Sequence, residues 1–318
     1  MTVLFIGLGA MGLPMARNLG RVRPDLIVFD ADPRALEAAS SAGLTASSGL
    51  DSLPSDLDTT VLMLPSTAIV ERVLYGDGDA GPGLLDRLPR GGAVVDMGSS
   101  EPLSTARIAA DAEAKGLRFV DAPVSGGVAK AVTGELAIMA GGTADDVARV
   151  RPLLDALGGH VVHVGPSGAG HAAKALNNLL SATNIAAAAE VLSAAARFGI
   201  RPETMLDVVN ASTGRSQASE VKYPAEVLTG RFASGFRMDL MLKDLAIARS
   251  LTSGGGLDTP VTDAAFRVAT DARPLAGEHP DHTELVRYYE DRNGVSLRAA
   301  SAATHDDGQD DDRTETTR

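Results

Sequence analysis

The stretch from Gly168 to Phe198 predicts one helix that is long enough to join two domains. It contains no proline and is rich in alanine, and Gly199 with Pro202 beyond it forms a helix stop signal. At ~1.5 Å per residue, such a helix spans about 45 Å. The chain of 318 residues also has the length expected of two domains, each with its own core. We therefore expect this helix to run from one domain into the other.

One face of this helix carries a polar stripe around Lys174. When the helix is drawn at ~100° per residue, four polar side chains lie near this lysine and leucines occupy the opposite face. These polar residues are Asn177, Asn178, Ser181 and Asn184. In an isolated helix such a lysine usually belongs to a solvated face. The sequence at the other end of the chain favours the alternative, the wall of a binding site.

A glycine-rich turn lies near the N-terminus. The apolar run Thr2–Ile6 has strand character, Gly7-Leu8-Gly9-Ala10-Met11-Gly12 follows at once, and Leu13–Leu19 has helical character. G-x-G-x-x-G between a strand and a helix is the spacing of a dinucleotide-binding turn. We predict that all six residues from Gly7 to Gly12 bind the cofactor.

Each glycine of this turn has a distinct physical task. Gly7 allows the tight turn, Gly9 lets the backbone approach a pyrophosphate, and Gly12 lets the helix pack closely on the strand. A second apolar run, Leu26–Phe29, ends at Asp30, whose carboxylate can hold the ribose hydroxyls. These residues together predict a dinucleotide cofactor.

Strands and helices alternate through the first half of the chain. Further strand-like runs are Thr59–Leu64, Ala93–Asp96, Arg118–Val124, Glu135–Ala140 and His160–Val164. Helical runs between them are Arg34–Ala42, Ala68–Leu74, Pro102–Lys115 and Ala144–Leu157. This alternation predicts an α/β domain of the Rossmann type with a parallel, doubly wound sheet.

The periodic stretches beyond Gly165 are all helical, and they are Glu203–Asn210, Met238–Thr252, Thr262–Thr270 and Glu284–Arg292. We expect a dinucleotide-binding domain at 1–164 and an all-helical substrate and oligomerisation domain at 165–298, joined by the long helix. Residues 299–318 are polar and acidic without an apolar period, which predicts a disordered tail.

Composition excludes several classes of function. A net charge of −12 argues against binding to nucleic acid through its phosphates. The chain has no cysteine, which excludes disulfides and thiolate metal sites and fits the cytoplasm. We see no 18-residue apolar run and no signal peptide, and therefore expect no membrane segment. The histidines lack the carboxylate pattern of a metal site, and His171 either lines a cleft or is exposed.

Motifs along residues 3–298 resemble those of the β-hydroxyacid dehydrogenase family, which includes 3-hydroxyisobutyrate dehydrogenase and tartronate semialdehyde reductase. They are FIGLGAMGLPMARNL (Phe5–Leu19), VLMLPS (Val61–Ser66), DAPVSGG (Asp121–Gly127) with AxxGEL behind it, GAGHAAKALNN (Gly168–Asn178) and FRMDLMLKDL (Phe236–Leu245). The resemblance implies an oxidoreductase that interconverts a short β-hydroxy acid and its aldehyde or keto acid.

The resemblance also implies roles for particular residues. Lys174 matches the general acid/base and Asn178 the residue that orients the substrate. The substrate-binding positions are Ser125, Gly126, Gly127 and Asn178, and the further cofactor-binding positions are Leu64, Pro65, Ser99, Phe236 and Lys243. An ammonium can protonate the alkoxide that forms when hydride adds to a carbonyl, and an amide can hold the same oxygen. Lys243 has an alternative role as the ion-pair partner of Asp244.

Two stretches depart from the family pattern. Asp30-Ala31-Asp32 stands where members that prefer NADP tend to have Asn-Arg-Thr, so we expect NAD, although Arg34 is near enough to weaken that preference. Ser212–Gln217 lacks an aromatic residue that is common there, which leaves the acid unidentified. Arg215 either binds a second anionic group or pairs with Glu220.

Two other functions and an assembly state remain open at this point. Imine-reducing enzymes share a related architecture, but they generally lack the lysine that Lys174 supplies. A non-catalytic NAD(P)-binding module would not need the pair Lys174 and Asn178. The alanine-rich helix suggests a homo-oligomer, a dimer or a tetramer, because small residues let subunits pack closely.

Overall fold

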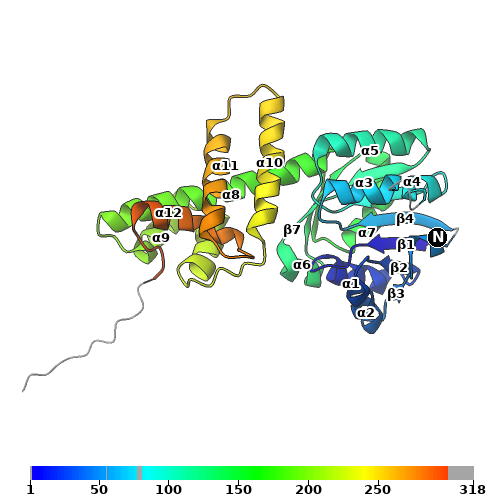
Figure 1. Ribbon diagram of the computed structural model, residues 1–318, viewed down its shortest axis with the longest axis horizontal. Coiled ribbons are helices and arrows are strands. Elements are labelled where there is room, and N and C mark those ends of the chain that lie inside the picture. The colour runs from blue at the N-terminus through cyan, green and yellow to red at the C-terminus, as the bar shows by residue number, and fades with distance from the viewer. Residues whose placement is uncertain (1, 55, 77–80, 300–318) are drawn as a thin grey trace, which may run out of the picture.

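The computed structural model describes residues 2–54, 56–76 and 81–299. Figure 1 shows two bodies joined by α8 (Ala169–Arg197). The expected tail lies outside the described residues except for Ala299. The long helix predicted from Gly168 to Phe198 is therefore present, with ends within a residue of the expectation.

The N-terminal body is built on one sheet. Its strands are β1 (Thr2–Ile6), β2 (Leu26–Phe29), β3 (Thr45–Ala46), β4 (Leu57–Leu62), β5 (Ala93–Asp96), β6 (Arg118–Asp121), β7 (Val124–Ser125), β8 (Ala137–Gly141) and β9 (His160–Gly165). They lie in the order β3-β2-β1-β4-β5-β6-β8-β7, with β9 beside β8. The strand order reverses between β1 and β4: β2 and β3 follow on one side of β1, and β4 and β5 follow on the other. Ligands of doubly wound sheets bind at the carboxyl ends of the strands at such a point.

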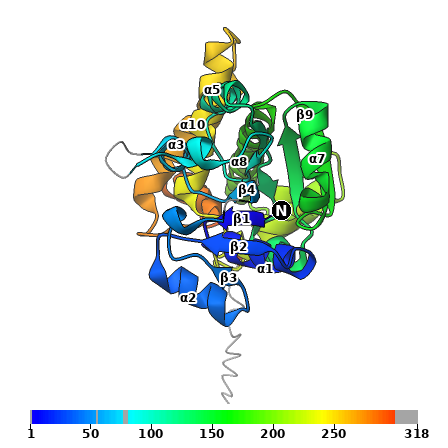
Figure 2. The same cartoon turned by 90° about the vertical axis from the view of Figure 1, so that its right-hand side faces the viewer.

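Helices cover both faces of this sheet (Figure 2). They are α1 (Gly12–Val22), α2 (Pro33–Ser41), α3 (Thr67–Tyr75), α4 (Leu84–Arg87), α5 (Pro102–Ala114), α6 (Gly127–Thr133) and α7 (Ala144–Asp155). Successive residues of β1 point to opposite faces: Val3 and Phe5 join one buried cluster, and Leu4 and Ile6 join another. Burial on both faces explains why the strands are continuous apolar runs.

The predicted α/β fold is confirmed, with two corrections to the sheet. β8 is antiparallel to both β6 and β7, whereas β9 is parallel to β8. The reason is the short connection from β7 to β8, in which α6 has only 7 residues, because a parallel crossover needs a dozen or more. The single strand expected at Arg118–Val124 is also interrupted before β7, where Pro123 offers no N–H to a ladder.

The C-terminal body is helical, as expected. Its elements after α8 are α9 (Pro202–Asn210), a π-helix (Ala218–Val227), α10 (Met238–Gly254), α11 (Pro260–Ala272), 3₁₀ turns at Arg273–Leu275 and His282–Val286, and α12 (Arg287–Asn293). In Figure 1, α10 and α11 stand across α8. The π-helix was not predicted. Tyr223 anchors it, because this side chain is fully buried and its hydroxyl donates to the Ile185 carbonyl of α8 at 2.7 Å.

The surface of α8 is only partly covered. Three large apolar side chains on it, Leu176, Leu180 and Val191, are exposed by 42 to 61%, and Phe198, directly after its last residue, is exposed by 86%. Among the described helices, α8 alone is long and apolar enough to cross a membrane by length and composition, contrary to our reading of the sequence, and 39% of its most apolar window is buried. A core helix of a domain meets the same test.

Candidate active site

In the glycine turn at the carboxyl end of β1, the fold itself requires two of the three glycines. Gly7 has a φ of +99°, and a Cβ there would lie 2.3 Å from the Met63 carbonyl oxygen. A Cβ on Gly12 would lie 1.8 Å from the Gly7 carbonyl oxygen. Gly9 is exposed, and a Cβ there would meet no protein atom within 4 Å. A bound pyrophosphate lying against the backbone would explain why position 9 is a glycine, so this turn fits the cofactor.

Asp30 lies beside this turn at the end of β2. Its carboxylate accepts hydrogen bonds from the Leu8 N–H at 2.6 Å and from the Asp32 N–H at 2.8 Å. Arg34 does not turn toward Asp30; its guanidinium pairs with Asp32 at 3.0 Å. The arginine that follows this position in the sequence is thus paired with another carboxylate.

The start of α8 is held to the sheet by Asp121, the last residue of β6. Its carboxylate is fully buried and accepts from the Gly168 N–H at 2.8 Å and the His171 N–H at 2.9 Å. A Cβ on Gly170 would lie 2.4 Å from the Met139 carbonyl oxygen and 2.7 Å from the Asp121 carbonyl oxygen. Asp121 opens the motif that resembles a substrate-binding segment, but its side chain caps the helix.

Lys174 lies in the second turn of α8, between the two bodies. Within residues 2–54, 56–76 and 81–299, its ammonium makes no hydrogen bond and no ion pair within 4 Å. Burial lowers the pKa of Lys174 below its usual value; the Asp244 carboxylate opposes that shift, and the neighbouring Lys243 ammonium adds to it. A lysine whose pKa is lowered in this way can act as a base as well as an acid.

Asp244 of α10 connects the elements around this lysine. It is 2% exposed, and its two oxygens accept from Asn178 Nδ2 at 2.6 Å and from Ser99 Oγ at 2.7 Å. Lys243 Nζ donates to the Ser99 carbonyl at 2.6 Å and lies 3.4 Å from Asp244. The structure therefore brings Ser99, Asn178 and Lys243 together from a loop and two helices.

Sequence reasoning missed the central place of Asp244. It considered this residue only as an ion-pair partner of Lys243, and that pair exists, but the carboxylate also holds the amide of Asn178. The signal available in the sequence was the amide itself, because a buried asparagine needs an acceptor for its N–H groups.

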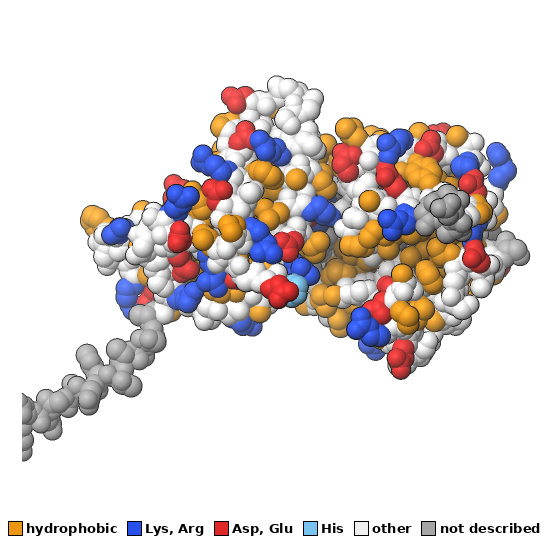
Figure 3. Space-filling model, viewed as in Figure 1, with side chains coloured by type: hydrophobic (Ala, Val, Ile, Leu, Met, Phe, Trp, Pro, Cys, Tyr) orange, Lys and Arg blue, Asp and Glu red, His pale blue; other side chains and the backbone are white. Residues whose placement is uncertain are grey.

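The expected substrate turn lies at the end of β7. Ser125 is half-buried, and the exposed Gly126 and Gly127 have φ values of +132° and +69°. Such backbone conformations favour glycine. Among the described residues, no hydrogen bond links this turn to Lys174 or Asn178. Figure 3 shows a hollow between the two bodies.

Leu64 and Pro65 lie in the loop after β4. A Cβ on Gly98 would lie 2.7 Å from the Leu64 carbonyl oxygen, so this loop packs against the loop that carries Ser99. The remaining predicted cofactor residues on the N-terminal body are thus close neighbours.

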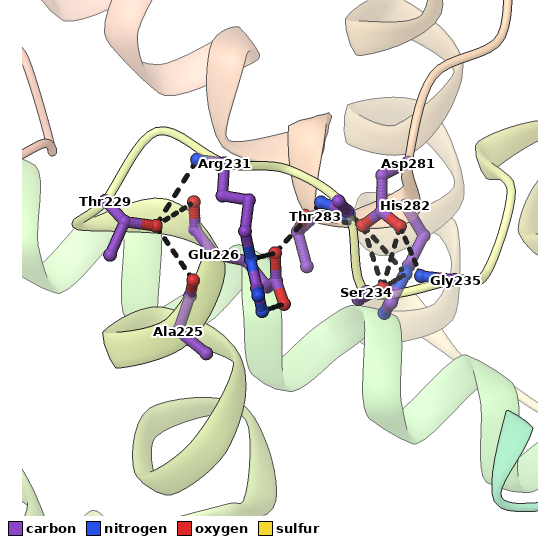
Figure 4. Close-up of polar contacts among 10 residues, drawn as sticks. Ala225, Glu226, Thr229, Arg231, Ser234, Gly235, Asp281, His282 and Thr283 are labelled. Carbon is purple, nitrogen blue, oxygen red and sulfur yellow. Dashed lines mark hydrogen bonds and ion pairs between the residues drawn. The ribbon is translucent and has the colours of Figure 1, made fainter. Parts of the chain in front are cut away.

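Phe236 lies in the loop that leads into α10. Its ring packs edge-on against His282 with 5.2 Å between the centroids, and its carbonyl accepts from the His282 N–H at 2.8 Å. Two buried carboxylates hold the rest of this loop (Figure 4). Glu226 binds Arg231 and the Ala233 N–H, and Asp281 accepts from the Ser234 hydroxyl and the Gly235 N–H. Burial raises the pKa of Asp281, but the hydrogen bonds from His282 and Thr283 outweigh it and hold the pKa well below its usual value.

Several expectations about other residues are corrected or remain open. His171 is neither exposed nor part of a cleft wall; it lies on the buried face of the first turn of α8 and is 1% exposed. Arg215 forms no ion pair with Glu220 among the described residues, although both are described. The described part of the chain contains no group of three or more His, Asp or Glu side chains that could hold a metal ion.

Comparison with known proteins identifies the family of this chain. Residues 2–165 match the family described as the NAD binding domain of 6-phosphogluconate dehydrogenase, and residues 168–289 match the family described as NAD-binding of NADP-dependent 3-hydroxyisobutyrate dehydrogenase. The chain is 37% identical to 2-(hydroxymethyl)glutarate dehydrogenase of Eubacterium barkeri over 92% of this chain and 96% of that protein. The chain belongs to the β-hydroxyacid dehydrogenase family.

Other relatives of the chain are named for different substrates. The chain is 30% identical to 3-sulfolactaldehyde reductase of Escherichia coli K12 over 93% of this chain and 98% of that protein. The solved structure of Mycobacterium tuberculosis 3-hydroxyisobutyrate dehydrogenase with L-serine has a TM-score of 0.80 and 29% identity, and covers 90% of this chain and 98% of that chain. The protein is therefore an NAD(P)-dependent oxidoreductase, which argues against the non-catalytic interpretation.

We expect the variants Gly9→Ala and Gly12→Ala to separate cofactor binding from folding. Gly9→Ala should keep the melting temperature, because its Cβ meets no protein atom, but weaken NADH binding about tenfold or more by crowding the pyrophosphate. Gly12→Ala should lose at least about 2 kcal/mol of stability because of its clash with the Gly7 carbonyl. Calorimetry and NADH titration measure both quantities. Unchanged NADH affinity in a folded Gly9→Ala protein would contradict the placement of the cofactor.

Proposed function

We propose that this dehydrogenase interconverts a short β-hydroxy acid and its aldehyde or keto acid, with Lys174 as the general acid/base. The observation that carries the proposal is the half-buried lysine at the junction of the two bodies, with a lowered pKa and no hydrogen bond among the described residues. Asn178 follows one turn later on the same helix and is held by Asp244. Lysine and amide can therefore reach one substrate oxygen.

The steps follow from these positions. The nicotinamide, when bound, supplies or takes up the hydride. In reduction, the Lys174 ammonium protonates the alkoxide that forms, and Asn178 donates its second N–H to the same oxygen. In oxidation, neutral Lys174 takes the hydroxyl proton. Asp244 keeps Asn178 in place and raises the pKa of Lys174, while burial and Lys243 lower it.

The substrate class is supported by the names of the relatives. 2-(Hydroxymethyl)glutarate, L-serine and 3-hydroxyisobutyrate all carry a hydroxyl on the carbon β to a carboxylate. We assign Ser125, Gly126 and Gly127 to that carboxylate, because N–H groups in a concave turn favour an anion. Leu64, Pro65, Ser99, Phe236 and Lys243 are assigned to the cofactor side.

The domain assignment follows the same division. Residues 1–164 bind the cofactor, residues 165–298 complete the substrate site and the oligomer, and residues 299–318 form an acidic tail. The compartment that we propose is the cytoplasm, in keeping with a chain without cysteine.

The variant Lys174→Met tests the mechanism. Loss of the general acid should reduce kcat by about 10²–10⁴, while folding and NADH affinity survive. Asn178→Ala should cost less, because it removes an orienting contact and keeps the proton source. Lys115→Met, at the C-terminal end of α5, is the matched control and should behave as wild type.

The pH profile tests the same residue independently. Because the pKa of Lys174 is lowered, the lysine loses its proton at a lower pH than an ordinary lysine. Over that pH interval the rate of oxidation should rise and the rate of reduction should fall. A Lys174→Met protein with near-normal turnover and an unchanged profile would remove the basis of the proposal.

The cofactor preference follows from Asp30. Its carboxylate would repel a 2′-phosphate, and Arg34 is occupied by Asp32, so we propose NAD as the cofactor. We expect kcat/KM to favour NAD over NADP by at least about tenfold, which corresponds to ~1.4 kcal/mol. The double variant Asp30→Asn with Ala31→Arg should narrow or invert the ratio. A wild-type preference for NADP would mean that Arg34 leaves Asp32 to bind the phosphate.

A homo-oligomer formed through α8 would cover its exposed apolar residues. Leu176 and Leu180 are spaced by one turn and exposed by 42% and 61%. Replacing both with serine should convert a dimer or tetramer into smaller species without loss of the fold, as measured by light scattering and circular dichroism. A wild-type protein with the molar mass of one chain would contradict the oligomer.

A further inference from the structure

A buried histidine beneath the proposed acid/base has no part in the reaction as described. His171 precedes Lys174 by one turn on α8, and its side chain is fully buried. The ring lies between the carboxylates that end β5 and β6. Its Nε2 is 3.7 Å from Asp96 Oδ2, and its Nδ1 is 3.9 Å from Asp121 Oδ2.

The contacts of the ring determine the place of one proton. Nδ1 lies 2.8 Å from Thr105 Oγ1, and the Thr105 hydroxyl donates to the Glu101 carbonyl at 3.0 Å. A hydroxyl has a single proton; while Thr105 donates it to the Glu101 carbonyl, the hydroxyl accepts from Nδ1, which then carries a hydrogen. Nε2 is buried and, in the described part of the chain, has no hydrogen-bond partner.

The two carboxylates that face this ring are supported only by neutral donors among the hydrogen bonds described. Asp96 is 1% exposed and accepts from the Gly98 N–H at 2.9 Å and the Ser100 hydroxyl at 2.8 Å. Asp121 accepts from two N–H groups of the α8 start. Buried carboxylates are stabilised by a nearby cation, and the imidazole is the basic group between them. A lone pair on Nε2 would face Asp96, whereas an N–H there would be attracted to it.

We propose that His171, with a proton on both ring nitrogens, is a positioning residue that sets the place of Lys174. It ties the first turn of α8 to the loop Asp96–Ser100. The same loop carries Ser99, which binds Asp244, and Asp244 holds Asn178. Lys174 thus lies between two supports, His171 one turn before it and Asn178 one turn after it, and both lead to one loop. The inference rests on the proposed function, because it takes Lys174 to be the acid/base.

Two substitutions of His171 each keep one of the two contacts of the ring and remove the other. In His171→Gln, the amide nitrogen reaches the position of Nε2 and keeps a donor toward Asp96. In His171→Asn, the shorter amide lies near the position of Nδ1, so the contact to Thr105 survives and the donor toward Asp96 is lost. His160→Asn is the matched control, since His160 is exposed at the start of β9.

We expect His171→Asn to lower kcat about tenfold or more, because small displacements of a reacting group are costly. The Kd for NADH should stay within about twofold, because the glycine turn that receives the pyrophosphate lies on β1 and not on α8. His171→Gln should restore kcat to within about threefold of wild type, and the control should match wild type. Equal kcat values for the two His171 variants, whether normal or low, would overturn the proposal.

A spectroscopic measurement covers the case in which His171→Asn does not fold. Nitrogen-15 NMR of the wild-type imidazoles, with His171 assigned by the loss of its signals in His171→Gln, should show protons on both ring nitrogens. A bare Nε2 would overturn the proposal whatever the kinetics. Failure of the proposed function is distinguishable: it would be shown by normal turnover in Lys174→Met or by no oxidation of any β-hydroxy acid by the wild type.

Discussion

The attachment of α8 to the carboxyl edge of the sheet by the Asp121 carboxylate is the interaction on which the site depends. The first N–H groups of a helix have no partner within it, and here Asp121 satisfies those of Gly168 and His171 in a fully buried place. An anion at a helix N-terminus is also favoured by the helix dipole. A hydrogen bond to a charged group typically contributes about 1.5–3 kcal/mol, so the domain junction has a strong and directional anchor. The glycines before Lys174 serve this anchor: side chains on Gly168 and Gly170 would collide with the N-terminal body.

The features that could be predicted from the sequence are those carried by neighbouring residues. The strand, glycine turn and helix at the N-terminus, the length of α8 and the helical C-terminal body all follow from local spacing, and the structure has each of them. Asp30 directly follows a predicted strand and lies beside the turn, where it accepts from the Leu8 N–H; its role toward the cofactor stays a prediction. Periodicity tells which segments form, because it reflects the repeat of one element and requires no knowledge of its partners.

Contacts between distant segments could not be predicted in this way. Asp244 accepts hydrogen bonds from Ser99, 145 positions away in the sequence, and from Asn178, 66 positions away. The local pattern MLKDL does not distinguish an acid at the surface from an acid that connects three elements. The burial of His171 has the same origin, because its environment is made by β5, β6 and α5. The antiparallel β8 shows a related limit: alternating strands and helices indicate a parallel sheet unless the connecting helix is recognised as too short.

In the reaction that we propose, the charges around Lys174 would let one lysine serve both directions. Burial alone would favour a neutral amine, which is a good base but has no proton to give. Asp244 alone would favour the ammonium and make proton release costly. In the structure, burial and the Lys243 ammonium lower the pKa of Lys174, and the Asp244 carboxylate raises it. The same carboxylate also holds the Asn178 amide. The position of Asn178 and the protonation of Lys174 are therefore coupled: the Asp244 carboxylate cannot move without changing both the electrostatic balance on the lysine and the orientation of the amide.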